Sequence, residues 1–316
     1  MDLTSTETSA TPAGGAAAIF AAAEPAPAAP HRVRRQIRPP DPEAVARVVA
    51  AALAEDLAFG DPTTDGLFEP DATALMSLLV KQPGVVCGLP IFAAVFAALD
   101  PAVVVAPLFI DGDRIDSAPR EIARVSGPTR AILSGERTAL NLLGRLSGIA
   151  TLTARCVAEL DGTGATLLDT RKTTAGLREL EKYAVRCGGG TNRRLNLGEA
   201  LLVTDNHLRL FGGIAAAVAG LRQSAPRLRL EVEAETLEDV RAALEAGVNR
   251  ILLDNMSTEE MRQAVALIGH GVESEASGGI SLANLRAVGE TGVDYVSLGA
   301  LTDAVWSLDV SLEVAG

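Results

Sequence analysis

The first strong pattern of hydrophobic and polar positions lies at residues 41–57 and is typical of an amphipathic α-helix. Its apolar residues recur at intervals of three and four, which places them on one helical face: Val45, Val48, Val49, Ala52, Leu53 and Leu57. Asp41 can cap this helix, and Pro42 fits its first position because an N–H there would have no helical partner. The pattern predicts that the first folded domain opens with this helix.

Strand-like and helical stretches follow without regular alternation. The pattern predicts strands at 73–82 and 114–127, and helices at 90–99 and 135–148. Folds built on parallel sheets repeat a strand and a helix in strict order, and this part of the chain does not. Residues 41–148 are therefore expected to form an α+β domain.

A different rhythm begins near residue 149, where short apolar runs of β character alternate with helical patterns. The runs occupy 165–170, 200–206, 228–235, 250–255, 272–279 and 295–301. Repeated strand–helix units imply parallel strands with right-handed crossovers. Six such units over residues 149–301 favour an α/β barrel, with an open doubly wound sheet as the structural alternative.

Polar residues and glycines gather where these strands end. They are Asp169, Arg171, Asp205, Asn206, Glu233, Glu235, Asp254, Asn255, Ser277, Gly278, Gly279 and Gly299. In α/β barrels the carboxyl ends of the strands and the loops after them build the active site. Any strand becomes polar as it leaves the core, but that does not account for so many carboxylates. We therefore place the candidate site at this end of the barrel.

Carboxylates on one strand are the first candidate ligands. Glu231, Glu233 and Glu235 point to the same side because side chains alternate along a strand. Buried carboxylates need partners, and ribose hydroxyls or a metal-bound water would serve Glu233; the alternative is an outer-face acid paired with a helix cation. Asp254 ends an apolar strand, and its alternative role as a helix cap is already filled by Ser257.

Two glycine-containing strand ends suggest a phosphate site. Gly278 and Gly279 offer successive backbone N–H groups just before a helix that opens near Ser281. Gly299 ends the next strand, and glycine loops after the last two strands form the phosphate site of many barrels. Each glycine alone would suggest only a turn, but their order favours phosphate.

The segment 169–197, DTRKTTAGLRELEKYAVRCGGGTNRRLNL, concentrates basic residues. Arg171 and Lys172 directly follow a strand, so they are expected over the barrel mouth. Arg194 lies beyond three glycines that would let the backbone approach a ligand. Guanidinium groups match carboxylate and phosphate in bidentate geometry. The remaining helical charges fit a solvated face and are assigned no chemistry: Arg178, Glu181 and Lys182.

Composition narrows the classes of partner. The net charge is −12, from 28 basic and 40 acidic residues, which argues against nucleic-acid or anionic-membrane binding. Three widely spaced cysteines form neither a disulfide framework nor a tetrahedral metal site, so a reducing cytoplasm is expected. No apolar run is long enough for a membrane span. Residues 1–40 are rich in Ala and Pro and are expected to be a disordered arm without a secretory signal.

Several stretches together resemble the quinolinate phosphoribosyltransferase family. They are EDLAFGDPTTD, GERTALNLLGRLSGIAT, DTRKTTAGLRELEKYAVRCGGG, DNH, EVEAETLEDV, LLDN, ESEASGGIS and TGVDYVSLGALT. The resemblance runs from about residue 41 to the C-terminus. It implies an α/β fold with an N-terminal α+β sandwich domain, an incomplete parallel α/β barrel, and a homodimer. The last residues, about 302–316, are expected to pack back on the sandwich.

The resemblance also implies a reaction and a set of site residues. Phosphoribosyl pyrophosphate and quinolinate would give nicotinate mononucleotide, pyrophosphate and carbon dioxide, with Mg²⁺ held through pyrophosphate and water. Lys172, Glu233 and Asp254 would be catalytic. Substrate would be bound by these three and by Thr170, Arg171, Arg193, Arg194, Thr204 and Arg137, the last from the partner subunit. The 5-phosphate would be bound by Ser277, Gly278, Gly279, Leu298, Gly299 and Ala300.

Two residues depart from the family's pattern. Arg193 stands where the family usually has histidine, and Thr204 stands where it usually has lysine. Both positions belong to the wall that would bind the aromatic acid. They leave open a paralogous phosphoribosyltransferase that uses a different aromatic carboxylic acid, and, with less support, a non-catalytic ligand-binding subunit.

Overall fold

The computed structural model describes residues 37–315 of the 316-residue chain. The arm expected over residues 1–40 therefore lies outside the described residues, except for its last four. Of these, Ile37 packs against the hydrophobic core and Pro40 is buried. Residues 37–40 thus belong to the folded part of the chain and not to the arm.

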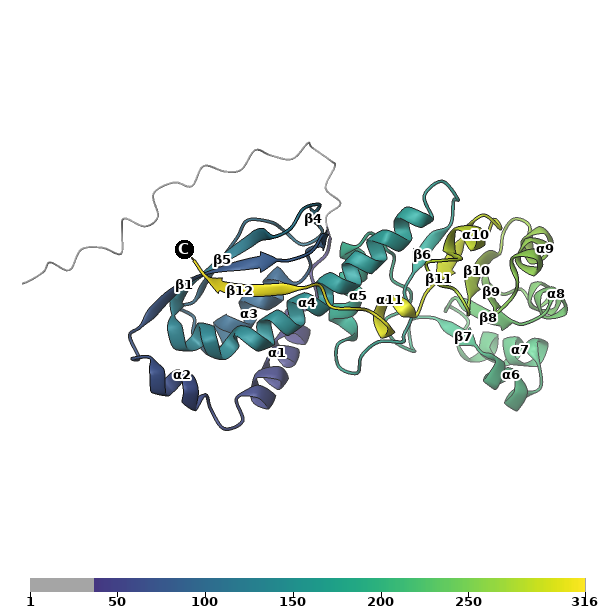
Figure 1. Cartoon of the computed structure of the whole chain (residues 1–316). Coiled ribbons are helices and arrows are strands. Elements are labelled where there is room, and N and C mark those ends of the chain that lie inside the picture. The colour runs from purple at the N-terminus through teal and green to yellow at the C-terminus, as the bar shows by residue number, and fades with distance from the viewer. Residues whose placement is uncertain (1–36, 316) are drawn as a thin grey trace, which may run out of the picture. The chain divides into compact units, whose positions relative to one another are not determined.

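A four-stranded antiparallel sheet forms the first domain, in the order β12-β1-β5-β3. Its strands are β1 (Thr73–Val80), β3 (Val104–Pro107), β5 (Arg120–Pro128) and β12 (Val310–Val314). Leu78 in β1 is fully buried and pairs with Leu312 of β12 on one side and Ala123 of β5 on the other. The C-terminal segment thus returns to the first domain as an edge strand of its sheet (Figure 1).

Three larger helices belong to this domain. They are α1 (Pro42–Asp56), α3 (Leu89–Leu99) and the long α4 (Thr129–Glu159), which contacts β1, β5 and β12. Two of them, α3 and α4, contact the sheet, while α1 packs on these two helices. The short helix α2 (Pro62–Leu67) and the two-stranded sheet of β2 (Gly84–Val85) and β4 (Arg114–Ile115) complete the domain. The single strand expected over 114–127 is wrong, because the chain bends at 117–119 and separates β4 from β5.

Gly148 does not end the helix expected over 135–148, since α4 continues to Glu159. A Cβ atom at Gly148 would lie 2.2 Å from the carbonyl oxygen of Trp306, so glycine is needed there for the approach of another segment. One turn earlier, the Gly144 carbonyl accepts a hydrogen bond from Leu308 N at 2.9 Å. The glycines of α4 therefore let the C-terminal segment pass along the helix on its way to β12.

Six parallel strands form the second sheet, in the order β6-β11-β10-β9-β8-β7. They are β6 (Thr166–Leu168), β7 (Leu201–Val203), β8 (Leu230–Ala234), β9 (Arg250–Asp254), β10 (Glu273–Ser277) and β11 (Tyr295–Ser297). Within residues 37–315, β6 and β7 do not pair, so the sheet does not close. A single bridge between Leu168 and Thr191 instead lies beside β6. The incomplete barrel implied by the family resemblance is confirmed.

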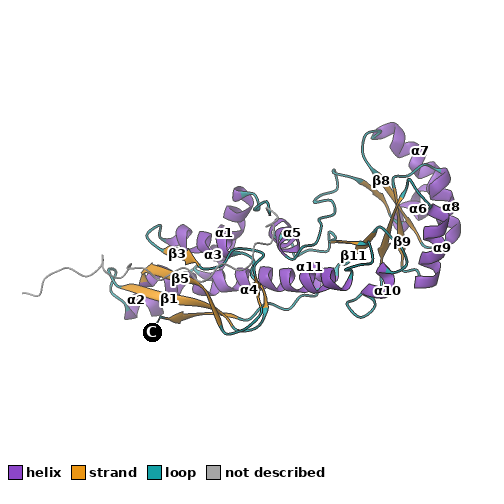
Figure 2. Cartoon of the chain, turned by 90° about the horizontal axis from the view of Figure 1, so that it is seen from above, coloured by secondary structure: helices purple, strands orange, loops and turns teal. Residues whose placement is uncertain are grey.

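The second sheet carries its helices on the outside, as Figure 2 shows for α7 (Ile214–Ser224), α8 (Leu237–Glu245) and α9 (Thr258–Ile268). The other helices of this part are α5 (Arg178–Cys187), α6 (Asp205–Phe211), α10 (Leu285–Gly289) and α11 (Ala300–Asp303). Capping boxes start α8 with Thr236 and Asp239, and α9 with Ser257 and Glu260. The turns between strands and helices thus follow the local sequence signals.

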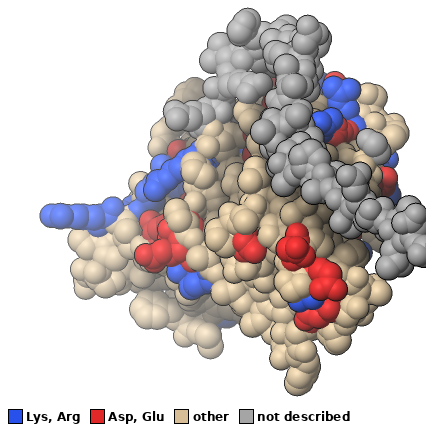
Figure 3. Space-filling model, turned by 90° about the vertical axis from the view of Figure 1, so that its left-hand side faces the viewer, with Lys and Arg blue, Asp and Glu red and all other residues tan. Residues whose placement is uncertain are grey.

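On the surface at the first-domain end of the molecule, charged side chains lie in small separate groups among uncharged ones (Figure 3). Among residues 37–315, no helix is both long enough and apolar enough to cross a bilayer.

Candidate active site

Thr170, Arg171 and Lys172 lie just beyond β6, after Asp169, and stand at the carboxyl end of the parallel sheet. The turn is fixed by the Thr170 hydroxyl, which accepts a hydrogen bond from Lys172 N at 3.0 Å, and by Thr302, whose hydroxyl donates to the Lys172 carbonyl at 2.6 Å. The Lys172 side chain runs over Gly299, where a Cβ atom would lie 2.7 Å from Lys172 Cδ. Gly299 therefore makes room for the lysine at the end of β11.

Arg171 and Arg194, which follow β6 and the triple glycine, have guanidinium groups with unused donors, as does Arg186 on α5. The Arg171 and Arg194 side chains are half-buried, and the Nε atom of each is buried without a hydrogen-bond partner among the described residues. Arg194 Nη1 donates to the Ala200 carbonyl at 2.9 Å. Burial, followed by the nearby charges of Arg193 and Arg171, lowers the pKa of Arg194. Buried donors are rarely left unpaired, so this pair fits an anionic ligand.

Arg193 is paired with carboxylates of its own chain, although the resemblance grouped it with the substrate-binding residues. Its Nη2 lies 2.5 Å from Glu231 Oε2, and its Nε lies 3.1 Å from Glu275 Oε1. The same two glutamates also contact Arg250, at 3.5 Å and 2.9 Å. The charge of Arg193 is therefore balanced by carboxylates from β8 and β10.

Lys182 and Glu181 on α5 were expected on a solvated face, and that expectation is wrong. Both are buried because α5 packs against α4 as well as against the loops at the sheet's edge. Lys182 Nζ lies 2.5 Å from Asp169 Oδ1 and donates to the Arg193 carbonyl at 3.0 Å. Glu181 accepts from Arg145 Nε of α4 at 2.8 Å. These charges hold the site's framework together.

Asp169 lies behind the segment 192–194 and not in the open mouth. Besides Lys182, it accepts hydrogen bonds from Arg193 N and Asn192 Nδ2, both at 2.7 Å. Burial raises the pKa of this carboxyl, and the Lys182 ammonium opposes that shift. Asp169 therefore holds the backbone from which Arg193 and Arg194 project.

The triple glycine after α5 approaches another helix, not a ligand as expected from the sequence. A Cβ atom at Gly188 would lie 2.4 Å from the Ala150 carbonyl oxygen, and one at Gly190 would lie 2.8 Å from Thr153 Cγ2. Gly189 has a φ of +91°, a left-handed conformation that favours glycine. These residues therefore seat the basic segment against α4.

Glu233 and Asp254 end the neighbouring strands β8 and β9. Glu233 Oε2 accepts a hydrogen bond from Asp205 N at 3.0 Å. Burial raises the pKa of the Glu233 carboxyl, and the charges of Asp254 and Asp205 add to the shift. Burial also raises the pKa of Asp254, while Lys172 opposes it. Two half-buried acids thus lie close to each other, and Asp254 also lies near the lysine that follows β6.

Thr204 is held by a histidine of the same motif. It is the N-cap of α6, its hydroxyl lies 2.8 Å from His207 Nδ1, and its N–H donates to the same nitrogen at 3.1 Å. Thr204 therefore brings no charge to the site.

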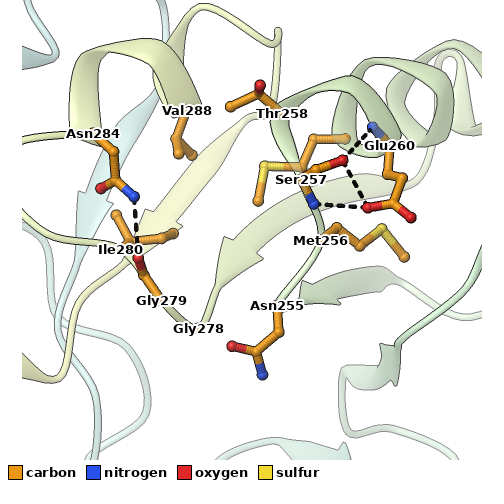
Figure 4. A pocket seen from close by; sticks show the side chains of 11 residues that line it. Asn255, Met256, Ser257, Thr258, Glu260, Gly278, Gly279, Ile280, Asn284 and Val288 are labelled. Carbon is orange, nitrogen blue, oxygen red and sulfur yellow. Dashed lines mark hydrogen bonds between the residues drawn. The ribbon is translucent and has the colours of Figure 1, made fainter.

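The glycine loop after β10 borders a cavity of about 410 Å³ between the starts of α9 and α10 (Figure 4). Gly278 and Gly279 have φ values of +80° and +63°. A Cβ atom at Gly278 would lie 2.3 Å from Asn255 Oδ1, so a larger residue would displace the Asn255 side chain and would be strained at this positive φ. Asn284 Nδ2 donates to the Gly279 carbonyl at 3.0 Å and fixes the loop. Asn284 had no signal in the sequence beyond a polar position in a loop.

The remaining phosphate-site candidates flank these glycines. Ser277 ends β10, whereas Leu298, Gly299 and Ala300 lead from β11 into α11. Leu298 is buried, and its backbone N–H donates to the Leu168 carbonyl of β6 at 3.1 Å. These loops therefore end adjacent strands of one sheet.

The chain matches two protein-family models. "Quinolinate phosphoribosyl transferase, N-terminal domain" covers residues 61–147, and "Quinolinate phosphoribosyl transferase, C-terminal domain" covers residues 149–313. The chain belongs to the quinolinate phosphoribosyltransferase family. The two matched regions meet within α4, the helix that both parts of the molecule share.

Named relatives agree with this membership. A "Probable nicotinate-nucleotide pyrophosphorylase [carboxylating]" of Bacillus subtilis is 42% identical over 261 residues, which are 82% of this chain and 90% of that protein. The Mycobacterium leprae "Nicotinate-nucleotide pyrophosphorylase [carboxylating]" is 38% identical over 278 residues, 86% of this chain and 98% of that protein. The crystal structure of NadC from Streptococcus pyogenes has a TM-score of 0.84 at 39% identity, covering 88% of this chain and all of that one.

Arg137 lies apart from the site of this quinolinate phosphoribosyltransferase family member. It is on the part of α4 that belongs to the first domain, and its side chain is exposed. Among the described residues no hydrogen bond or salt bridge holds its guanidinium. Arg137 is therefore available to a partner outside its own chain.

Cys87 and Asp111 of the first domain lie close to Cys187 of α5, although their spacing in the sequence did not predict this cluster. The donor atoms of Cys87, Asp111 and Cys187 lie within 4.8 Å of one another. Asp111 is already used: it accepts hydrogen bonds from Gly88 N and Leu89 N, at 2.9 Å and 3.0 Å. It also accepts one from the Tyr183 hydroxyl at 2.7 Å. The cluster therefore ties the start of α3 to α5.

Proposed function

We propose that this chain transfers the phosphoribosyl group of phosphoribosyl pyrophosphate to quinolinate, with decarboxylation, as a step of NAD biosynthesis. The products are nicotinate mononucleotide, pyrophosphate and carbon dioxide. The observation that carries the proposal is the pair Arg171 and Arg194, whose buried, unpaired Nε atoms stand at the mouth of a sheet that also presents Glu233, Asp254 and the glycine loop. Family membership assigns this arrangement its substrate class.

The residues fit a reaction that depends on charge and not on a protein nucleophile. The bond between C1 of the ribose and the pyrophosphate oxygen breaks, and the quinolinate ring nitrogen forms the new bond to C1. Glu233 and Asp254 bind the ribose hydroxyls, and their negative charge stabilises the cationic character that develops on the sugar. Lys172 and the two arginines bind the anionic groups.

Decarboxylation follows from the same bond. Once ribosylated, the ring nitrogen is cationic and can accept the electron pair left when carbon dioxide departs from the adjacent carbon. That carbon then takes a proton to give nicotinate mononucleotide. Arg171 and Arg194 hold the acid's carboxylates while the ring nitrogen faces the sugar.

Mg²⁺ fits the oxygen donors at the strand ends as an ion held indirectly. The charges of Asp205 and Asp254 both act on the Glu233 carboxyl, and oxygen is the ligand that Mg²⁺ prefers. Within residues 37–315 their donor atoms do not gather into a three-ligand cluster within 4.8 Å. We therefore propose that Mg²⁺ is bound through pyrophosphate and water, where it supplies charge to the departing pyrophosphate.

A homodimer would complete the site. Arg137 is exposed without a partner in its own chain, and we propose that it reaches the acid site of the partner subunit. Large apolar side chains that stand in water within a single chain support such an interface: Phe59, Leu210, Phe211 and Trp306. The three free, buried thiols fit a reducing cytoplasm as the enzyme's location.

The test is a panel of aromatic acids with phosphoribosyl pyrophosphate and Mg²⁺. Quinolinate should release carbon dioxide and give nicotinate mononucleotide, and chelation of Mg²⁺ should abolish the release. The Lys172→Ala variant is the matched negative control. Absence of product at high enzyme concentration would contradict the proposal.

A second candidate is favoured by one observation. Arg193 is already paired with two glutamates and Thr204 is neutral, so the wall of the acid site has fewer free cations than the sequence indicated. We propose as the alternative that a different aromatic carboxylic acid is the preferred substrate. Nicotinate, picolinate and phthalate in the same panel distinguish the two, and turnover of quinolinate alone would remove the alternative.

A further inference from the structure

The segment that carries Arg193 and Arg194 is fixed at its backbone. Arg193 N donates to Asp169 Oδ1 at 2.7 Å, and the Arg193 carbonyl accepts from Lys182 Nζ at 3.0 Å. Both partners are almost completely buried. The backbone of Arg193 thus has little freedom where α5 and β6 meet.

The Arg193 side chain is fixed in a second place, inside the six-stranded sheet. Its guanidinium contacts Glu231 of β8 and Glu275 of β10, and only 11% of the side chain is exposed. Glu231 lies 38 residues away in sequence and Glu275 lies 82 residues away. Arg193 therefore crosses from the loop to two strands of the barrel interior.

The charges inside the sheet balance without any ligand. Glu231, Glu275 and Glu273 supply three negative charges, and Arg193, Arg250 and Arg229 supply three positive ones. If Arg193 moved to bind a substrate carboxylate, a buried glutamate would lose part of its positive partner charge. An incompletely paired buried carboxylate costs free energy. Arg194, the next residue, has no carboxylate partner among the described residues and keeps an unpaired buried Nε.

We propose that Arg193 is a positioning residue that pins the segment 192–194 to the barrel interior and so sets where Arg194 meets the acid substrate. This inference rests on the proposed function, because it assigns Arg194 and not Arg193 to the carboxylate. Arg193 then determines specificity through the placement of its neighbour.

Isosteric variants of its partners separate this role from direct substrate contact. If Arg193 bound the acid, Glu275→Gln or Glu231→Gln would release its charge and lower the KM for the acid. If Arg193 is a tether, the same variants loosen the segment, and the KM for the acid rises about tenfold, the scale of one weakened charge-assisted contact. The KM for phosphoribosyl pyrophosphate should change less than about twofold.

Glu273→Gln is the matched control. Glu273 pairs with Arg250 and Arg229 but makes no contact with Arg193, so it perturbs the same ionic cluster from the other side. Its KM for the acid should equal that of the unmodified enzyme. An equal rise in Glu273→Gln and Glu275→Gln would reduce Arg193 to a structural role and overturn the proposal, as would a lower KM in Glu275→Gln.

Hydrogen exchange gives a readout independent of turnover. The amide of Arg193 should exchange faster in Glu275→Gln and in Arg193→Lys than in the unmodified enzyme or in Glu273→Gln. Arg193→Lys keeps the charge, so it also serves if a glutamine variant fails to fold. Unchanged exchange in both variants would overturn the tether. An unmodified enzyme that never turns over quinolinate would contradict the proposed function while leaving this exchange test intact.

Discussion

Lys182 Nζ lies 2.5 Å from Asp169 Oδ1, and the two side chains are 2% and 0% exposed. Burial lowers the pKa of Lys182 and raises that of Asp169, and each partner opposes the shift of the other. The pair joins α5 to the end of β6 and supports the backbone of Arg193. It is a framework contact that supports the segment from which Arg193 and Arg194 project.

Removing the lysine should cost much more than removing a surface lysine. Lys182→Met leaves the Asp169 carboxylate buried without its cation, so the free energy of unfolding should fall by about 3–5 kcal/mol. Lys81→Met is the control, because the Lys81–Glu313 pair is about half exposed and should cost less than about 1 kcal/mol. Urea unfolding of both variants measures the difference, and equal losses would contradict a supporting role for the buried pair.

Two inactive variants should restore activity when mixed, if Arg137 serves the partner's site. The Arg137→Ala and Lys172→Ala enzymes should each be nearly inactive. After subunit exchange, half of the dimers are mixed, and each has one site with both residues, so about a quarter of the original rate should return.

Mass spectrometry of the intact mixture provides the control for that experiment by showing that mixed dimers have formed. Mixed dimers without recovered activity would place Arg137 and Lys172 in the same site of one chain. If the two variants were monomers and each retained activity, the proposed role of the dimer would be contradicted.

The acid limb of the pH profile of kcat/KM should lie at a higher pH than the pKa values of ordinary carboxyl groups would give. Burial raises the pKa of Glu233 and of Asp254, and the proposed function requires both to be ionised so that they bind the ribose hydroxyls and help to order Mg²⁺. As pH falls through these raised values the groups take up protons, so kcat/KM should decline already above pH of about 4.

Asp254→Asn tests that assignment. The charge of Asp254 contributes to the raised pKa of Glu233. Its removal should lower the plateau of kcat/KM and also move the acid limb to lower pH. A limb that stays in place would mean that other groups control it.

The three thiols should be unreactive in the native enzyme. Burial raises the pKa of Cys156 to about 11 and that of Cys87 well above its usual range, so little thiolate of these two residues exists at about pH 8, while Cys187 is shielded by its burial. A disulfide reagent that reports free thiols should react with none of the three cysteines before unfolding and with all of them afterwards. Rapid native labelling of Cys87 or Cys187 would indicate that the contact between α3 and α5 opens.

The sequence alone determined the features that depend on local spacing. Alternating strand and helix patterns predicted the parallel sheet, and the capping boxes of α8 and α9 formed as expected. Arg171 and Lys172 directly follow a strand predicted from the sequence, so their position alone was enough to predict that they lie at the mouth of the barrel. The consecutive glycines at 278–279 predicted a loop after the strand, and the structure has that loop with a positive φ at both residues.

Only the tertiary structure decided which charges are free. Lys182 and Arg193 look like surface or ligand cations in the sequence, but their carboxylate partners come from other elements, up to 82 residues away. Gly148 was expected to end a helix, yet it admits the Trp306 backbone from the far end of the chain. Periodicity is encoded within one element, whereas burial and ion pairing depend on which elements pack together, and that is set only when the whole chain has folded.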